Sequence, residues 1–485
     1  MFKKSKRVFI LSVIFILSVS CTAHSVTRYE FLSSLLTARG LDWSESEEAQ
    51  YNDAAGFILK SGYVTDDVEN ISGNATRREV LRWCIQSLGL TFESELLSDY
   101  PLPFNDAKSL TEFERGCLVV AINMNPPLFN NYEDKFRGND ALTQNEARDI
   151  YNAVRSASRN LTFDMVRNPL KGLRVFIHRE GVPTGYPQWR VQVTGLPSKG
   201  SAEDSKNVLK TQGYDVNVIY SGGSWGFRTQ KIEDYNRVRR LLAYVKLRKL
   251  RAKVSPSLTN TNMRIVPKFW VMLVIDPSYW RISPIASYLG PNDLAPLSRI
   301  NSENEAGASI NGGFFAVMKG GNGYPIGALK VSGRLISEAY DNRGCLGWND
   351  NDEAVFYVAS EENNSWSDMS NIIQAGPLLI EDGQPSRHEE TFNSSLISAR
   401  HPRSAVGLTD KGEWVFLAVD GRNGMHSSGA TISELTDILR ARNIVYALNL
   451  DGGGSTEIII AGRIYNIPSD GHERNISYAL GALPR

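Results

Sequence analysis

The spacing of apolar and polar residues changes twice along the chain, and each change predicts a different kind of folded unit. Between residues 26 and 157, apolar residues recur at helical intervals. Strand-like alternation mixed with amphipathic segments occupies residues 185–250, and short apolar runs that end in glycine or polar residues fill residues 255–485. The 485 residues exceed a single ordinary core. We therefore predict a multidomain protein with an all-α region, a small α+β sheet and a C-terminal α+β domain built on a mixed sheet.

A loose repeat marks the helical region, residues 26–157. In each copy a threonine precedes a glutamate by three residues, which is the pattern of a helix capping box. The pairs are Thr27 with Glu30, Thr76 with Glu79, and Thr143 with Glu146. Further apolar helices are expected to open at Asn52-Asp53-Ala54 and at Phe104-Asn105-Asp106-Ala107.

This order resembles S-layer homology repeats, which implies three helical units that bind cell-wall polymers. Arg28 and Arg77 follow the threonine of the first two repeats, whereas Gln144 takes that place in the third. An anionic-polymer site that uses this arginine is therefore not expected in the third unit. Capping alone would explain the threonines and glutamates, so glycan binding and a purely structural role both stay open.

The second region, residues 185–250, predicts the order strand, helix, strand, strand, helix. The segments are residues 189–193, 202–209, 214–218, 225–229 and 235–245. They resemble a SPOR domain, which implies recognition of peptidoglycan glycan strands. Trp225 and Phe227 could stack on sugar rings, although core packing would use the same aromatic residues. The basic run from Arg237 to Lys253 is interpreted as a solvated helix and linker, with an anionic envelope polymer as the alternative partner.

The C-terminal domain contains the pattern that is most informative about function. Residues 445–450 predict a short buried strand that leads into Asp451, three glycines and Ser455. Glycine admits positive φ and lets a ligand approach the backbone, and successive N–H groups can hold an anion. Three similar fragments are Asn311-Gly312-Gly313, Ala375-Gly376-Pro377 and Asp420-Gly421-Arg422. One amphipathic helix is predicted over residues 431–441, with Thr431 or Ser433 as its N-cap.

In this order the fragments resemble the phosphodiester glycosidase family over residues 262–485. Arg403 lies between the second fragment and the last, and the likeness extends to Asn466 and to Glu473-Arg474-Asn475. The resemblance implies hydrolysis of a sugar attached through its anomeric carbon to a phosphodiester, as in N-acetylglucosamine-1-phosphodiester glycosidases. The products would be the sugar and a phosphomonoester.

Such a reaction needs a carboxylate near the anomeric carbon and positive charge for the departing phosphate. Asp451 or Asp420 is the expected base or nucleophile, and the residues leave the choice open. The expected phosphate ligands are the guanidinium groups of Arg403, Arg422 and Arg474 and the N–H groups of Gly452, Gly453 and Gly454. The other candidates for substrate or phosphate binding are Asn311, Gly312, Gly313, Gly376, Ser455 and Glu473.

Each fragment also has a structural alternative. Asp420-Gly421 could form a turn, Asn311-Gly312-Gly313 a tight bend, and Arg403 could pair with a buried carboxylate. A non-catalytic glycan-binding protein with the same fold is therefore the alternative function. The nearby His401, His426 and His472 could be structural or could shuttle a proton.

Net charge and the candidate metal ligands limit the kinds of partner that the protein is expected to bind. Lys plus Arg and Asp plus Glu number 53 each, so net charge suggests neither nucleic acid nor an anionic membrane surface as a partner. No cofactor is implied, but oxygen-rich side chains could hold a calcium or magnesium ion or equally bind sugar hydroxyls. These side chains are Asp420, Asp451, Asn311, Asn449 and Glu457.

Residues 1–24 predict export. Lysines and an arginine precede an apolar run from Val8 to Val19, which matches a secretory signal. Ser18-Val19-Ser20-Cys21 loosely resembles a lipoprotein cleavage box, so a lipid on Cys21 and ordinary cleavage nearby both stay open. The expected location is the periplasm or cell envelope, with membrane contact only through that lipid. Residues 26–250 would then localise the enzyme without performing chemistry.

The remaining cysteines are Cys84, Cys117 and Cys345, which are too few for a disulfide framework. Cys84 and Cys117 fall in predicted helices and could pair or act as small buried hydrophobic residues.

Overall fold

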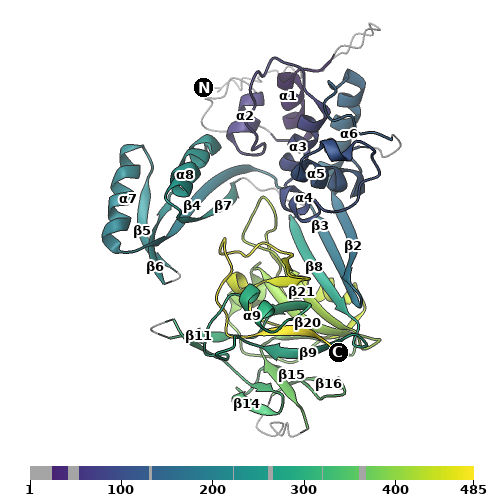
Figure 1. Cartoon of the computed structure of the whole chain (residues 1–485), viewed down its shortest axis with the longest axis vertical. Coiled ribbons are helices and arrows are strands. Elements are labelled where there is room, and N and C mark those ends of the chain that lie inside the picture. Colours follow the sequence, from purple (N-terminus) through teal and green to yellow (C-terminus); the bar gives the residue numbers. More distant parts are fainter. Residues whose placement is uncertain are drawn as a thin grey trace, which may run out of the picture.

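The structure is a computed structural model that describes residues 25–41, 54–129, 134–221, 223–259, 266–318, 321–359 and 368–485. The predicted signal and Cys21 lie outside these residues, as do Asn52 and Asp53. Figure 1 shows a helical unit at the top, a small-sheet lobe at the left and a β-rich body below. Among the described residues, no helix is long and apolar enough to cross a membrane.

The helical unit confirms the predicted capping boxes. Its helices are α1 (Arg28–Ala38), α2 (Ala54–Lys60), α3 (Arg77–Ser87), α4 (Thr91–Leu96), α5 (Glu112–Asn123) and α6 (Gln144–Asn160). All three predicted threonine–glutamate pairs form the box, and Thr111 with Glu114 forms another. The prediction that an apolar helix opens at Asp106 is wrong, because only a 3-10 turn, Ala107–Ser109, follows this residue. The Asp106 carboxylate instead accepts the N–H groups of Phe136 and Arg137 at 2.8 Å each.

The three repeats meet in a ring of backbone hydrogen bonds. Val26 N donates to Leu142 O, Leu142 N to Ala75 O, and Ala75 N to Val26 O, at 2.8–2.9 Å. Arg28 Nε lies 2.9 Å from Glu79 Oε1, and Arg77 pairs with Glu146. The arginine of one repeat therefore neutralises the capping glutamate of the next.

The small-sheet lobe has the predicted order of elements and one more strand. Its elements are β4 (Tyr186–Leu196), α7 (Lys199–Thr211), β5 (Val216–Ser221), β6 (Ser224–Thr229), α8 (Tyr235–Leu247) and β7 (Arg251–Thr259). The sheet order is β5-β6-β4-β7. Phe227 is fully buried in the core of the lobe and Trp225 packs against that core, so core packing accounts for both aromatic residues.

The body is organised by a large sheet with the order β1-β2-β3-β8-β21-β20-β22-β18-β19. Its strands are β1 (Met124–Asn125), β2 (Thr162–Leu170), β3 (Leu173–Glu180), β8 (Lys268–Ile275), β18 (Leu378–Glu381), β19 (Gln384–Pro385), β20 (Arg403–Thr409), β21 (Trp414–Val419) and β22 (Ile444–Asn449). One face packs against α11 (Ile432–Arg440), which Thr431 caps as predicted. The opposite face contributes to the main core.

The predicted mixed sheet is wrong, because every strand pairing among the described residues is antiparallel. A short turn joins β20 to β21, which gives an antiparallel hairpin. The crossover through α11 joins β21 to β22, but these strands lie on opposite sides of β20 and do not pair.

The large sheet also uses residues that precede the lobe. β3 pairs with β8 over eight residues, from Leu173 opposite Ile275 to Glu180 opposite Lys268. A chain that begins at residue 255 would therefore lack β2 and β3 and would leave the edge of β8 unpaired.

Three smaller sheets complete the body. One has the order β24-β23-β10-β25-β9, one the order β14-β13-β17-β15-β16, and β11 pairs with β12. Their strands are β9 (Trp280–Ile285), β10 (Ala308–Asn311), β11 (Phe315–Val317), β12 (Gly323–Pro325), β13 (Leu329–Val331), β14 (Arg334–Ser337), β15 (Gly344–Trp348), β16 (Ala354–Val358), β17 (Asn371–Gln374), β23 (Ile458–Ile460), β24 (Arg463–Ile464) and β25 (Ala479–Pro484). The short helices are α9 (Leu297–Glu303) and α10 (Ser394–Ser398).

Cys84, Cys117 and Cys345 are buried and free, so Cys84 and Cys117 act as small hydrophobic residues.

Candidate functional site

The glycine run lies where β22 ends, as predicted. Asp451 follows Leu450, and residues Gly453–Ser455 form a 3-10 turn before β23. Asp451 N donates to Gly312 O at 3.1 Å, and Asn311 Nδ2 donates to Asp451 O at 2.7 Å. The fragments around Asn311 and Asp451 therefore come together, and Asn311 acts by joining the two backbones.

Two guanidinium groups lie directly over the glycines. A Cβ atom on Gly453, whose φ is +64°, would lie 3.0 Å from Arg422 Nη2. A Cβ atom on Gly454 would lie 2.0 Å from Arg474 Nη2. A Cβ atom at Gly453 would need only a small shift of Arg422, whereas one at Gly454 would displace Arg474 and also Asp470, whose Oδ2 would lie 2.1 Å away. Positive φ favours glycine at the first position, and the close approach of charged side chains favours it at the second.

Asp451 lies beside these cations. Its Oδ1 accepts the N–H of Gly452 at 2.9 Å. Burial raises the pKa of Asp451, while hydrogen bonding to Ser455 and the charges of Arg474 and Arg422 oppose that rise. The result is a carboxyl group with a raised pKa next to two guanidinium groups.

Arg474 is held by a neighbouring carboxylate. Its Nε and Nη2 donate to Asp470 Oδ2 at 2.9 and 2.7 Å, and its Nη1 donates to Ser455 Oγ at 3.4 Å. Arg422 is exposed and has a φ of +60°. One arginine is thus fixed in place, and the other reaches the glycines from an exposed turn.

Asp420 is buried and occupied on both oxygens. Asn466 Nδ2 and Ile467 N donate to Oδ1 at 3.0 and 3.1 Å, and Ile467 N also approaches Oδ2 at 2.9 Å. His426 Nε2 lies 2.9 Å from Oδ2. Through these contacts Asp420 holds the 466–467 segment.

A buried ionic chain continues from Asp420 into the helical unit. His426 Nδ1 lies 3.7 Å from Glu93 Oε1, and that oxygen lies 3.1 Å from Arg179 Nε. Glu93 and Arg179 are fully buried. Glu93 is on α4 and Arg179 on β3, so residues outside 255–485 reach the candidate site.

Other predicted ligands have structural contacts. Arg403 is buried and donates to three backbone carbonyls, those of Ala430, Leu396 and Ala399, at 2.6–2.9 Å. Burial and the neighbouring Arg422 lower the pKa of Arg403 to about 10. These bonds engage its Nε and Nη2, so a bidentate grip on phosphate by Arg403 would need them to break.

Gly376 and Gly313 are closely packed. Gly376 has a φ of +118°, and its carbonyl accepts Asn449 Nδ2 at 2.7 Å. A Cβ atom on Gly313 would lie 2.5 Å from Tyr478 Oη, and burial raises the pKa of that tyrosine. A Cβ atom on Gly376 would lie 2.4 Å from Glu390 Oε2, so both positions leave no room for a side chain.

Glu457 and Glu473 form a carboxyl pair that the sequence analysis did not predict. Burial, followed by the neighbouring Glu473, raises the pKa of Glu457 to about 10, and the two carboxyl groups share a hydrogen bond. The other carboxylate, Glu473, accepts from Ser298 N at 3.1 Å and Ser298 Oγ at 2.5 Å. The sequence marks Glu457 only as an oxygen ligand, because the pairing depends on a fold contact 16 residues away.

No three His, Cys, Asp or Glu side chains gather closely enough to hold a metal ion in the part of the chain that the structure describes. The predicted ligands Asp420 and Asp451 instead engage protein hydrogen-bond donors.

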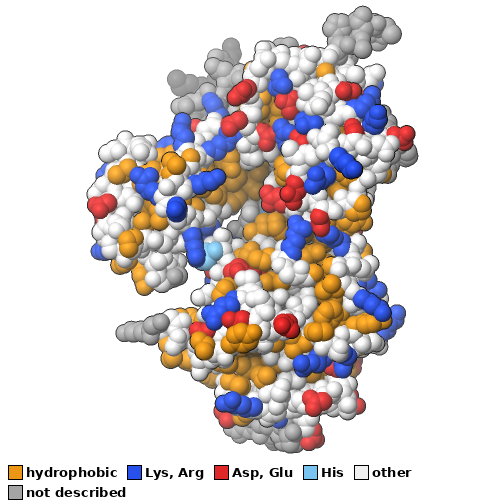
Figure 2. Space-filling model, in the orientation of Figure 1, with side chains coloured by type: hydrophobic (Ala, Val, Ile, Leu, Met, Phe, Trp, Pro, Cys, Tyr) orange, Lys and Arg blue, Asp and Glu red, His pale blue; other side chains and the backbone are white. Residues whose placement is uncertain are grey.

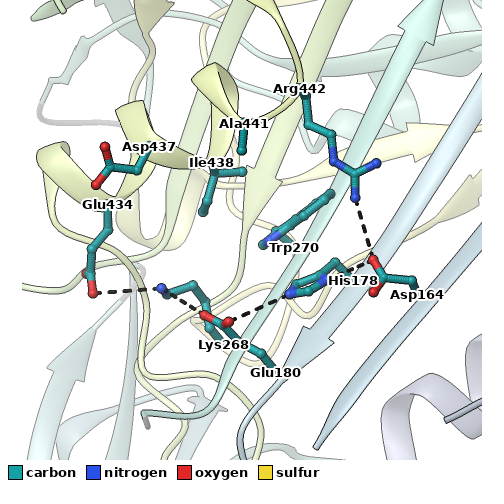
Figure 3. A pocket seen from close by; sticks show the side chains of 10 residues that line it. All are labelled: Asp164, His178, Glu180, Lys268, Trp270, Glu434, Asp437, Ile438, Ala441 and Arg442. Atoms are coloured by element: carbon teal, nitrogen blue, oxygen red, sulfur yellow. Dashed lines mark hydrogen bonds and ion pairs between the residues drawn. The ribbon is translucent and has the colours of Figure 1, made fainter. Parts of the chain in front are cut away.

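Another cavity lies away from the candidate site and is shown in Figure 3. It has a volume of about 420 Å³ and lies between β2, β3, β8 and α11. Its charged side chains pair with one another: Lys268 Nζ lies 3.1 Å from Glu180 and 3.7 Å from Glu434, and Arg442 lies 3.5 Å from Asp164. None of the sequence-predicted site residues lines it.

A smaller cavity of about 110 Å³ adjoins the candidate site. Its lining combines loops of the body with a strand of the small-sheet lobe. The lining residues are Ala252, Lys253, Val254, Ser255, Asp420, Gly421, Arg422, Asn423, His426, Ile467, Pro468, Ser469 and Gly471.

Comparisons with known proteins identify the C-terminal part. The phosphodiester glycosidase family profile matches residues 304–483. The N-acetylglucosamine-1-phosphodiester alpha-N-acetylglucosaminidase of Bos taurus is 31% identical over 209 residues, which are 39% of this chain and 38% of the relative. The uncharacterized SPbeta prophage-derived protein YomE of Bacillus subtilis is 26% identical over 235 residues, 46% of this chain and 34% of the relative.

The chain thus spans between about a third and two fifths of the length of these relatives. Among solved structures, the zebrafish N-acetylglucosamine-1-phosphodiester alpha-N-acetylglucosaminidase catalytic domain, auto-inhibited by its pro-peptide, aligns with a TM-score of 0.39 at 19% identity. That alignment covers 45% of this chain and 78% of the zebrafish chain. The glycine run, Arg422, Arg474 and Asp451 all fall inside the family match, and residues 304–483 are a domain of the phosphodiester glycosidase kind.

Proposed function

We propose that the protein hydrolyses a sugar-1-phosphodiester and releases the sugar and a phosphomonoester. The observation that carries this proposal is the position of the Asp451 carboxyl group, whose pKa burial raises, beside two guanidinium groups that lie over Gly453 and Gly454. The family match and the activity named for the bovine relative support it. N-acetylglucosamine is the sugar that this likeness favours.

The chemistry follows from the charges. Asp451 in its ionised form accepts a proton from water, and the water oxygen bonds to the anomeric carbon. The bond from that carbon to the phosphate oxygen breaks, and its electron pair leaves with the phosphate. Arg422 and Arg474 bind the phosphate oxygens and stabilise the charge that develops there.

The test is hydrolysis of a synthetic N-acetylglucosamine-1-phosphodiester by the full chain, followed as reducing sugar and phosphomonoester. Asp451→Asn should lower kcat by about 10²- to 10⁴-fold, because it removes the charged base while keeping its shape. Asp410→Asn is the matched control, since Asp410 is an exposed turn residue. Near wild-type turnover by Asp451→Asn would remove Asp451 from catalysis.

We further propose that the protein is exported and that the regions before the catalytic body bind cell-wall polymer. The signal-like residues 1–24 and the resemblances of the helical unit and the lobe support this location. Arg28 and Arg77 are engaged by glutamates within the helical unit, so the lobe is the better candidate for glycan binding. Sedimentation of the full chain with isolated cell-wall sacculi tests it, and a protein that stays in the supernatant would contradict it.

A further inference from the structure

The cavity of about 110 Å³ has walls from two parts of the molecule. One wall is β7 of the small-sheet lobe, and the other consists of the loops around Arg422 and residues 467–471. This space is large enough to admit a small anionic group such as a phosphate.

Cations surround this cavity. Lys253 and Arg422 line it, and Arg474 and Arg228 lie near enough to act electrostatically on Lys253. Burial lowers the pKa of Lys253 and the three arginines lower it further, while Asp470 opposes the shift. Asp420 also lines the cavity, but its carboxylate is engaged by Asn466, Ile467 and His426, so the remaining positive charge fits an anion. Figure 2 shows Lys and Arg side chains, with Asp and Glu side chains beside them, where the lobe approaches the body.

The sheet of the lobe positions two of these cations, Arg228 and Lys253. Gln192 of β4 lies opposite Arg228 on one side and opposite Lys253 on the other, so the three side chains share one face. Arg228 Nε donates to Gln192 Oε1 at 2.9 Å. On the body side, Gly471 has a φ of +78°, and a Cβ atom there would lie 2.7 Å from Lys253 Cβ. The stem of Lys253 is therefore packed against the body.

The cavity is separate from the glycine run, residues 452–454. None of the residues Asp451–Ser455 lines it, whereas Arg422 lines it and also lies over Gly453. A phosphate cleaved over the glycines would therefore not fill the cavity. A substrate that uses both places must carry a second anionic group, with Arg422 between the two.

We propose that Lys253 and Arg422 form a second phosphate subsite, so that the preferred substrate is an oligomer of sugar phosphodiesters and not a single diester. This proposal rests on the proposed function. It makes the small-sheet lobe a determinant of specificity at the site as well as a neighbour of it.

The kinetic test compares synthetic substrates with one and with two sugar-1-phosphodiester units. The wild-type chain should have about tenfold higher kcat/KM on the longer substrate, as one added charge-assisted contact predicts. Lys253→Gln should abolish this preference, and Lys253→Arg should restore it. Arg251→Gln, an exposed residue of the same strand that lies outside the cavity lining, should leave both rates unchanged. Equal preference in the wild-type chain and in Lys253→Gln would overturn the proposal.

A binding test separates this proposal from the proposed function. Calorimetric titration with inorganic phosphate should give two sites in the wild-type chain and one in Lys253→Gln. A change from two sites to one without any hydrolysis would support the subsite and refute the proposed function. Hydrolysis together with an unchanged number of phosphate sites would refute the subsite and support the proposed function.

Discussion

At the scale of single residues, the candidate site depends on the lack of side chains at Gly453 and Gly454. Gly453 and Gly454 leave room for two guanidinium groups, and the closer of these would overlap a Cβ atom at 2.0 Å. The predicted anion cradle of backbone N–H groups is wrong for two of the three glycines, because Gly452 N donates to Asp451 Oδ1 and Gly453 N donates to Pro402 O. What the glycines provide is room for the positive charge, which the local pattern does not predict because the arginines come from segments 31 and 20 residues away.

Gly454→Ala should abolish turnover while the fold is retained. The added methyl group displaces Arg474 from its position beside Ser455, so phosphate loses one of its two ligands. The measurement is kcat/KM on the single diester together with the thermal midpoint. Gly200→Ala is the matched control, because a Cβ atom there meets only Ser198 Oγ at 3.6 Å. Retained activity in Gly454→Ala would contradict the role of the glycine.

The pH dependence gives a second prediction at this scale. Asp451 must be ionised to act as a base, and burial raises its pKa, so kcat/KM should fall with falling pH at values above those of an ordinary aspartate. Arg474 opposes that rise, and Arg474→Gln should move the acidic limb to higher pH. Arg463→Gln, a surface change on β24, should leave the limb in place. A limb that does not move in Arg474→Gln would argue against Asp451 as the titrating base.

At the scale of elements, local signals were predictable and distant pairings were not. The capping boxes at Thr27, Thr76, Thr143 and Thr431 form as predicted, because a cap depends on residues three apart. The pairing of β3 with β8 joins segments separated by the whole small-sheet lobe, and no local pattern encodes it. Lys253 was interpreted as part of a solvated basic run for the same reason, because its partners belong to another part of the chain.

The short helix α4 carries a prediction of its own. Glu93 neutralises Arg179 and approaches His426, all in a buried setting. Glu93→Gln leaves Arg179 buried without its partner, which should cost about 3–5 kcal/mol of unfolding free energy. It should also loosen His426 and Asp420 and so lower kcat. Glu95→Gln, an exposed change in the same helix, is the control. An unchanged denaturant midpoint in Glu93→Gln would show that the chain of charges is not stabilising.

At the scale of the whole molecule, the catalytic body is not the C-terminal segment alone. The sequence interpretation assigns chemistry to residues after 255 and localisation to residues 26–250. In the structure, β2, β3, Arg179 and Glu93 come from the earlier part. The family match begins only at residue 304, so neither sequence likeness nor local pattern marks these residues as part of the body.

Truncation should therefore distinguish two starting points. A chain of residues 255–485 should aggregate or unfold without a cooperative transition, because the edge of β8 is exposed. A chain that begins at residue 161 keeps the β2–β3 hairpin and should be more soluble. The measurements are the soluble fraction and the thermal transition of each chain. A soluble, cooperative and active 255–485 fragment would contradict this view of the body.

The register of β3 and β8 shows how the lobe is connected to the body. Glu180 at the end of β3 faces Lys268 at the start of β8, so the chain leaves the large sheet and returns to it at the same place. The lobe of residues 186–259 is therefore an insertion in what would otherwise be a hairpin loop. A short flexible linker in its place would keep every strand of the large sheet, and a different lobe could be grafted at the same point. An exchanged lobe would change the residues that line the cavity of about 110 Å³ on the lobe side, while Asp451, Arg422 and Arg474 stay in place.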